Sequence, residues 1–103
     1  MKVYRPTEFR GEKAWQAQDI CAVNGITCRL HWTDQPYIWH VNDGEEIFAV
    51  LDGTVKMHVR KDGKEETIAL KTGDVFYAGE GDEHYAEPVG EARILVIEKE
   101  GSI

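Results

Sequence analysis

The sequence contains neither an apolar run long enough to cross a membrane nor an excess of basic residues. No apolar run approaches the roughly 18 residues of a membrane-spanning helix, and the opening stretch MKVYRPTEFRGEKAW lacks the apolar core of a secretory signal. The 19 acidic residues outnumber the 12 basic ones, which are scattered, and the formal net charge is -7. Such a surface repels a phosphate backbone. We therefore expect no membrane partner, no nucleic-acid partner and a cytoplasmic location.

Cysteine is scarce as well, since the chain has only Cys21 and Cys28. Their number and spacing fit neither a disulfide framework nor a zinc knuckle. The dipeptide Asn24-Gly25 lies midway between them and is the strongest short signal for a two-residue hairpin turn. Such a turn places the two cysteines opposite each other, with Cα atoms about 4.5 to 5.5 Å apart, within reach of a disulfide. In a reducing cytosol we expect two buried thiols that oxidise reversibly only under stress.

Helical periodicity is also missing, and runs typical of β-strands recur along the chain instead. Turn sequences such as Asp43-Gly44 and Asp52-Gly53 separate these runs. The expected strands are 17–23, 26–33, 36–41, 45–51, 54–60, 65–70, 74–78, 83–88 and 92–99. A chain of 103 residues is too short for two ordinary domains. The pattern therefore predicts one all-β domain, a single-domain jelly-roll β-barrel that protects its strand edges by closing.

Alternation along the strands predicts which side chains face inward. In TVKMHVR, Met57 lies on the same face as Val55 and Val59, and the adjacent His58 is therefore expected on the opposite, solvated face. In ITCRLHW, the apolar residues lie on the same face of the strand as Trp32. His31, adjacent to Trp32, is therefore expected on the opposite, polar face. Both histidines are thus predicted to lie at the surface.

The strand expected at 45–51 is apolar on both faces. Phe48 and Val50 lie on one face, and the residues on the other are just as apolar, namely Ile47, Ala49 and Leu51. A strand of this kind is buried on both sides. One cover is the N-terminal segment around Val3, Tyr4, Phe9 and Trp15. The other is a second copy of the chain, so we also expect a homodimer.

One polar group lies among these inward-facing residues. His40 and Asn42 share a face of their strand, and Glu46 shares a face with the apolar Phe48. Burying a lone carboxylate is costly unless it is paired, protonated or bound to a cation. His84 lies in a second glycine-marked stretch, GDVFYAGEGDEHYAEP, after its glycines, and this stretch is expected to bring a further ligand across the barrel. These residues predict a metal site inside the barrel.

The two stretches resemble the two motifs of the cupin superfamily. In the first motif, three or four residues separate a His-x-His pair from a glutamate, and six residues separate that glutamate from a glycine. It is matched by His40, Glu46 and Gly53. The second motif runs from a glycine through a proline and another glycine to a histidine, and is matched by Gly73, Gly81 and His84. The resemblance covers residues 17–98, which form the expected barrel core, with residues 1–16 packing on it.

The resemblance implies a small jelly-roll barrel with a divalent metal held by His40, Glu46 and His84. Asn42 stands where the family has its second histidine, Gly79 replaces the proline of the second motif, and Pro88 replaces its final asparagine. An amide oxygen is a weaker donor than imidazole, so Asn42 would be a weak fourth ligand. Two histidines and one carboxylate suit iron, manganese, nickel or zinc. Some cupins are metal-free, and in that case the same residues form a hydrogen-bonded network.

The function implied by the resemblance is the binding of a small oxygenated molecule in the barrel. Residues expected around the pocket mouth are Trp39, Phe48, Tyr77 and Tyr85, with Tyr77 and Tyr85 as proton donors. One hypothesis is a metal-dependent isomerase or oxygenase acting on a molecule such as a keto or hydroxy acid. A second is a ligand-binding module for a sugar or metabolite without catalysis. A third is a structural partner in a larger complex.

Overall fold

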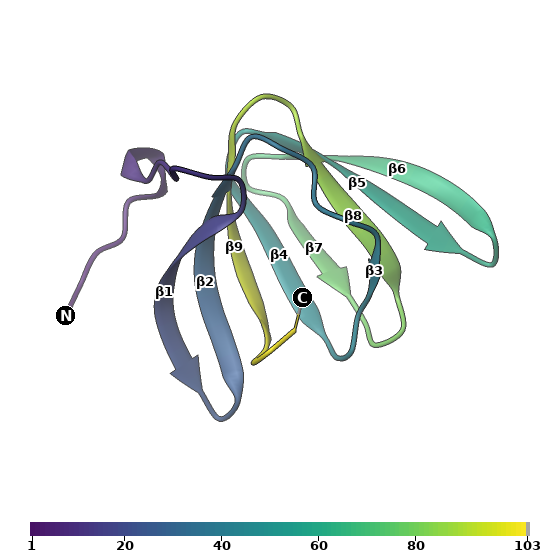
Figure 1. Cartoon of the computed structure of the whole chain (residues 1–103), viewed down its shortest axis with the longest axis horizontal. Coiled ribbons are helices and arrows are strands. Elements are labelled where there is room, and N and C mark those ends of the chain that lie inside the picture. The colour runs from purple at the N-terminus through teal and green to yellow at the C-terminus, as the bar shows by residue number, and fades with distance from the viewer. Residues whose placement is uncertain (103) are drawn as a thin grey trace.

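The computed structural model describes residues 1–102, and almost every regular element in this part of the chain is a strand. A short 3-10 turn, η1 (Pro6–Glu8), precedes the strands (Figure 1). The nine strands are β1 (Gln16–Val23), β2 (Ile26–Thr33), β3 (His40–Val41), β4 (Glu46–Asp52), β5 (Thr54–Lys61), β6 (Lys64–Lys71), β7 (Val75–Ala78), β8 (Glu83–Pro88) and β9 (Ala92–Lys99). None of the elements described for residues 1–102 is a helix with the length and apolar character needed to cross a membrane.

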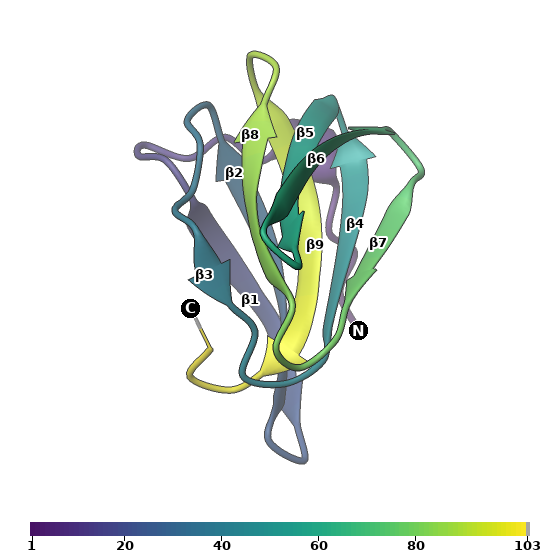
Figure 2. The ribbon, with the colours of Figure 1, turned by 90° about the vertical axis from the view of Figure 1, so that its right-hand side faces the viewer.

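The strands form two antiparallel sheets that lie face to face (Figures 1 and 2). The larger sheet has the order β1-β2-β9-β4-β7, and the smaller has the order β3-β8-β5-β6. Consecutive strands often lie in different sheets, as β4 and β5 do, so the chain crosses repeatedly between the two layers. This arrangement confirms the prediction of an all-β jelly roll, although the described strands form two separate sheets and do not close at their edges.

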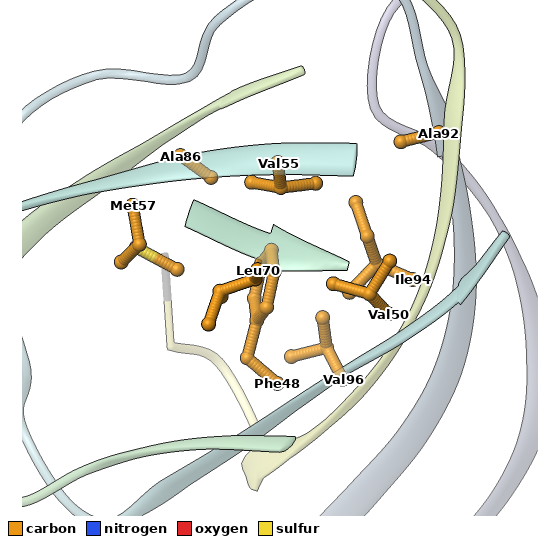
Figure 3. Packing of buried hydrophobic residues seen from close by; sticks show 9 residues of the cluster. All are labelled: Phe48, Val50, Val55, Met57, Leu70, Ala86, Ala92, Ile94 and Val96. Carbon is orange, nitrogen blue, oxygen red and sulfur yellow. The ribbon is translucent and has the colours of Figure 1, made fainter. Parts of the chain in front are cut away.

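The core fills the space between the sheets. The larger sheet contributes Phe48, Val50, Ala92, Ile94 and Val96, and the smaller contributes Val55, Met57, Leu70 and Ala86 (Figure 3). Along β4, β5 and β9 the buried residues are two apart, because alternate side chains of a strand point to the same face. The inward orientation predicted for Met57 is confirmed, since this side chain is fully buried.

One expected strand is much shorter than its sequence suggested. Residues 36–41 were expected to be extended and paired, but only His40 and Val41 pair with β8. Pro36 has no N–H to donate to a strand ladder, and Tyr37 makes a single backbone bond to Ala86. The other strand bounds agree with the expected ranges to within one residue.

The outer face of the larger sheet is covered in part by the N-terminal segment. The turn η1 contacts β4 and β9, and the ring of Trp32 approaches Gly11 so closely that a Cβ there would lie 2.8 Å from it. Val3, expected in this cover, is 76% exposed, and Trp15 lines the inner cavity instead. Apolar side chains remain exposed on the outer face, among them Val75, and the homodimer stays a prediction that light scattering can test.

The β1–β2 hairpin has the predicted turn and register. Asn24 and Gly25 both have positive φ, 51° and 78°, as a type I′ turn requires, and Cys21 pairs with Cys28. The expectation that both thiols are buried is wrong for Cys21, which is exposed, while Cys28 is half-buried. The cause is the position of the hairpin, whose turn extends past the rest of the barrel (Figure 2). Burial raises the pKa of the Cys28 thiol, and the neighbouring Cys21 raises it further.

We expect peroxide to join Cys21 and Cys28 in a disulfide, because cross-strand neighbours have the Cα spacing that this bond needs. Each thiol loses one hydrogen, and dithiothreitol restores both. Mass spectrometry after alkylation measures the change, with Cys21→Ser as the control that leaves one free thiol. Two alkylated cysteines after peroxide treatment of the unmodified protein would contradict the prediction.

Candidate functional site

A cavity of about 210 Å³ opens between the two sheets at one end of the barrel. Its walls come from β2, β4, β8 and β9, from His40 of β3 and from the segments that hold Trp15, Tyr37 and Ser102. The lining residues are Trp15, Arg29, His31, Tyr37, His40, Glu46, Phe48, His84, Ala86, Val96, Glu98 and Ser102. Cavities for drug-sized ligands begin at about 300 Å³. The space therefore suits a small molecule.

His40, Glu46 and His84 meet in this cavity. One ligand atom of each lies within 4.8 Å of the others. Their strands explain the meeting, because His40 on β3 is the direct partner of His84 on β8, while Glu46 begins β4 in the facing sheet. Glu46 is 6% exposed and His84 is 2% exposed. The sequence-predicted group is thus brought together, with Glu46 and His84 buried and His40 half-buried.

Hydrogen bonds fix the orientation of both imidazoles. His40 Nδ1 lies 3.0 Å from the carbonyl oxygen of Ile38, which only accepts, so Nδ1 carries the proton and Nε2 keeps its lone pair. Metal-binding histidines are commonly oriented by such a bond. His84 Nε2 donates to Asn42 Oδ1 at 2.8 Å, so its Nδ1 keeps the lone pair, and Nε2 also lies 3.2 Å from Glu46 Oε1.

A divalent cation fits the donor atoms of this group. Within residues 1–102, the buried Glu46 Oε1 and His84 Nδ1 have no hydrogen-bond partner. The 3.2 Å approach of Glu46 to His84 is an ion-pair contact without hydrogen-bond geometry. Buried polar atoms without a partner are costly, and a cation would satisfy the carboxylate oxygen. Two imidazoles and a carboxylate are the donor set of mononuclear iron, manganese, nickel and zinc sites.

Asn42, predicted as a fourth metal ligand, contacts the site through His84. Its side chain is buried with the residue 7% exposed, and its backbone is held by the loop before β8, where its N–H donates to Asp82 and its carbonyl accepts from Gly81. These bonds fix Asn42, and its side chain in turn fixes the ring of His84. The structure thus gives Asn42 a role in orienting His84.

A second carboxylate lies beside the group. Glu98 on β9 is the direct cross-strand partner of Glu46. Burial raises the pKa of Glu98 to about 7, with the Glu46 carboxylate as the next largest cause. Burial and these two glutamates also raise the pKa of the Tyr37 hydroxyl. Glu98 can therefore hold a proton near neutral pH at the wall of the cavity.

Of the four residues expected at the pocket mouth, only Phe48 lines the cavity. Trp39, Tyr77 and Tyr85 lie outside it, and strand alternation gives the reason. Each of these three directly follows or precedes an inward-facing residue in the chain, and neighbouring side chains point to opposite faces. Phe76 packs against the core, for example, and therefore turns Tyr77 outward, where it is 55% exposed.

The outward-facing aromatic residues have partners of their own. Tyr85 stacks on His58 with ring centroids 4.4 Å apart, and Trp39 meets the edge of Tyr85 at 4.7 Å. Tyr77 donates to Glu45 at 2.7 Å. The proton-donor roles expected for Tyr77 and Tyr85 therefore have no support in their placement. His58 lies on the outer face as predicted, although its side chain is only 20% exposed.

Sequence reasoning missed several cavity residues, and His31 is the clearest case. It was expected at the surface but lines the cavity with Arg29. Burial lowers the pKa of His31, which favours the uncharged form of its imidazole. The side chains of β2 alternate as predicted, but its inner face is the one with Arg29 and His31, because the N-terminal segment buries Trp32 on the outer side. Alternation along 92–99 could have identified Glu98, which shares the inner face of Ile94 and Val96.

Comparisons with known proteins agree with this geometry. The family model described as "Cupin domain" matches residues 30–98. The chain is 32% identical over 92 residues to a 3-hydroxyanthranilate 3,4-dioxygenase from Burkholderia lata, covering 86% of this chain and 49% of that protein. It is 30% identical over 61 residues to the protein of that name from Bos taurus, covering 59% of this chain and 21% of that one. The chain thus spans at most about half the length of these curated relatives.

Solved structures give the same result for the fold. A cupin-2 domain containing protein from Shewanella frigidimarina superposes with a TM-score of 0.76 at 26% identity, covering 86% of this chain and 84% of that one. A cupin superfamily protein from Desulfitobacterium hafniense superposes with a TM-score of 0.77 at 12% identity, covering 91% and 85%. Because the family model spans most of the barrel and the histidine-glutamate-histidine group lies inside it, this chain belongs to the cupin family.

Proposed function

We propose that this protein is a metal-dependent cupin that binds a small oxygenated molecule in its barrel and acts on it as an oxygenase. The observation that carries the proposal is the group His40, Glu46 and His84, whose ligand atoms converge within 4.8 Å and in which Glu46 and His84 are buried. Two histidines and one carboxylate form the facial triad of non-haem iron oxygenases. The matched relatives named as dioxygenases support the same class of reaction.

Each residue has a defined part in the proposal. His40 offers Nε2 because its Nδ1 donates to Ile38, and Glu46 offers a buried carboxylate oxygen. When bound, the metal supplies Lewis acidity and a site for activating oxygen. Glu98, with a pKa of about 7, can accept or release a proton at its carboxyl group beside the bound molecule. Phe48 and Val96 give the cavity an apolar wall against which the carbon skeleton of a bound molecule can pack.

A second candidate function is ligand binding without a metal. It is favoured by the contacts among the polar residues themselves, since His84 already meets Asn42 and Glu46. Such a network can persist in a barrel that binds a metabolite and releases it unchanged. The two candidates differ in metal content.

We expect the purified, untagged protein to contain a nearly stoichiometric divalent metal, measured by elemental mass spectrometry. The double variant His40→Ala/His84→Ala should lose it, because one carboxylate cannot hold the ion alone. His58→Ala is the matched control, since this histidine lies on the outer face with Glu87 as its partner. A wild-type protein that neither contains metal nor takes it up in a titration would support the metal-free candidate.

Turnover is measured separately in an oxygen electrode with the iron-loaded protein. Small hydroxylated aromatic acids, including 3-hydroxyanthranilate, are the first substrates to try because of the relatives. Oxygen consumption that Glu46→Gln removes would support the oxygenase. Metal binding without oxygen consumption for any of these acids would favour a binding module.

A further inference from the structure

Arg29 lies on the inner face of the barrel. It pairs with Val96 of β9, which in turn pairs with Phe48 of β4, and these three residues line the same cavity. An arginine among inward-facing apolar residues departs from the usual pattern of a strand, where charged side chains face solvent. Its side chain lines the cavity and is 42% exposed, so the guanidinium group is within reach of a molecule that enters from solvent.

The contacts of Arg29 within residues 1–102 use only part of its guanidinium group. Its Nε donates to Asp19 Oδ1 at 2.7 Å, and the Asp19 side chain is 79% exposed. An ion pair this exposed contributes little to stability. A guanidinium has five N–H donors in a planar fork, which matches the two oxygens of a carboxylate. The pair with Asp19 orients the group and leaves its terminal nitrogens available.

From this we infer that the cavity takes a small organic acid, whose carboxylate is held by Arg29 while its other end reaches His40, Glu46 and His84. The inference rests on the proposed binding function and names its class of ligand. Arg29 is level with Phe48 across β9, two residues along β4 from Glu46, so two inter-strand spacings and one two-residue step, about 12 Å in all, separate the backbones of Arg29 and Glu46. Both side chains extend inward, which leaves room between them for a molecule of a few carbon atoms.

Trp15 adds a donor on the same wall. Its Nε1 is buried and has no hydrogen-bond partner within residues 1–102, and the residue lines the cavity. Its backbone carbonyl accepts from His31 Nδ1 at 3.0 Å, which leaves His31 Nε2 as an acceptor. The wall formed by Trp15, Arg29 and His31 thus presents two donors and one acceptor. An acid that also carries a hydroxyl group satisfies this set.

The test compares salicylate with salicylamide, which share shape and phenol group but differ in charge. Isothermal titration calorimetry measures both on the purified protein, and the metal content of each sample is determined in parallel. We expect salicylate to bind about 10-fold to 100-fold more tightly, because hydrogen bonds to a charged group have that effect. In Arg29→Met the preference should disappear, and in Arg29→Lys part of it should remain since the charge is kept without the fork. Arg10→Met is the matched control, with a side chain that is 76% exposed.

Three results would overturn the inference: equal binding of acid and amide by the wild type, a preference that survives in Arg29→Met, or no binding of salicylate at millimolar concentration. Thermal unfolding of each variant shows whether its barrel is intact. The outcome is separable from that of the proposed function. If the protein contains metal but binds salicylate and salicylamide equally, the metal site stands and the role of Arg29 is removed. If the protein prefers salicylate but holds no metal, the role of Arg29 stands and the metal site is removed.

Discussion

Asn42→Ala is expected to weaken metal binding by about 10-fold to 100-fold while leaving the barrel folded, an effect typical of removing a partner that orients a ligand. Asn42 Oδ1 lies 2.8 Å from His84 Nε2, and both side chains are buried. Without this contact the ring of His84 is free to turn away from Glu46. A competition titration against a zinc chelator measures the change in affinity.

The matched control removes a comparable hydrogen bond outside the cavity. Thr67 Oγ1 lies 3.1 Å from His58 Nδ1 on the outer face, so Thr67→Ala should leave metal affinity unchanged. If Asn42→Ala binds metal as tightly as the wild type, Asn42 has no orienting role. If its loss equals that of His84→Ala, Asn42 is a direct ligand, as its place in the family motif suggests. Thermal unfolding of both variants separates a local effect from a loss of structure.

The features that the sequence predicted well depend on local chemistry. The turn at Asn24-Gly25 sets its own hairpin register, because both residues adopt positive φ. The inward position of Glu46 followed from its sharing a face with Phe48 and Val50, and all three are buried. Strand alternation needs no knowledge of distant residues once one face is known to be inner.

The errors came from deciding which face of a strand is inner, since that choice depends on the whole chain. On β2 the large apolar Trp32 faces outward, because the segment around Gly11 covers it. The cavity face is then left to Arg29 and His31. Tyr85 was expected at the pocket although its neighbour His84 had been placed inside, and both cannot face inward on one strand. The inward position predicted for His84 is enough to place Tyr85 on the outer face, because adjacent side chains of a strand point to opposite faces. On β2 no residue was predicted to bind the metal, so the same reasoning could not have identified its inner face.

The largest loss of stability is expected for Gly53→Ala, which should lower the free energy of unfolding by about 3 to 5 kcal/mol. Gly53 joins β4 to β5 with φ of 95°, and a Cβ there would lie 2.6 Å from the carbonyl oxygen of Glu91 and 3.2 Å from Ala92 Cα. Both atoms belong to the backbone at the start of β9, so they cannot move aside as a flexible side chain does. Backbone strain and steric overlap therefore add at this position.

Gly63→Ala separates the two contributions. Gly63 has φ of 75° in the β5–β6 hairpin, and a Cβ there meets nothing within 4 Å. Its substitution should cost only the about 1 to 2 kcal/mol of a left-handed conformation. Thermal unfolding compares the variants, and about 4 to 8 °C in Tm is expected for each kcal/mol in a domain of this size. Equal losses for the two variants would mean that the turn at Gly53 relaxes away from β9. A larger loss for Gly53→Ala identifies close contact with β9 as the reason that only glycine fits there.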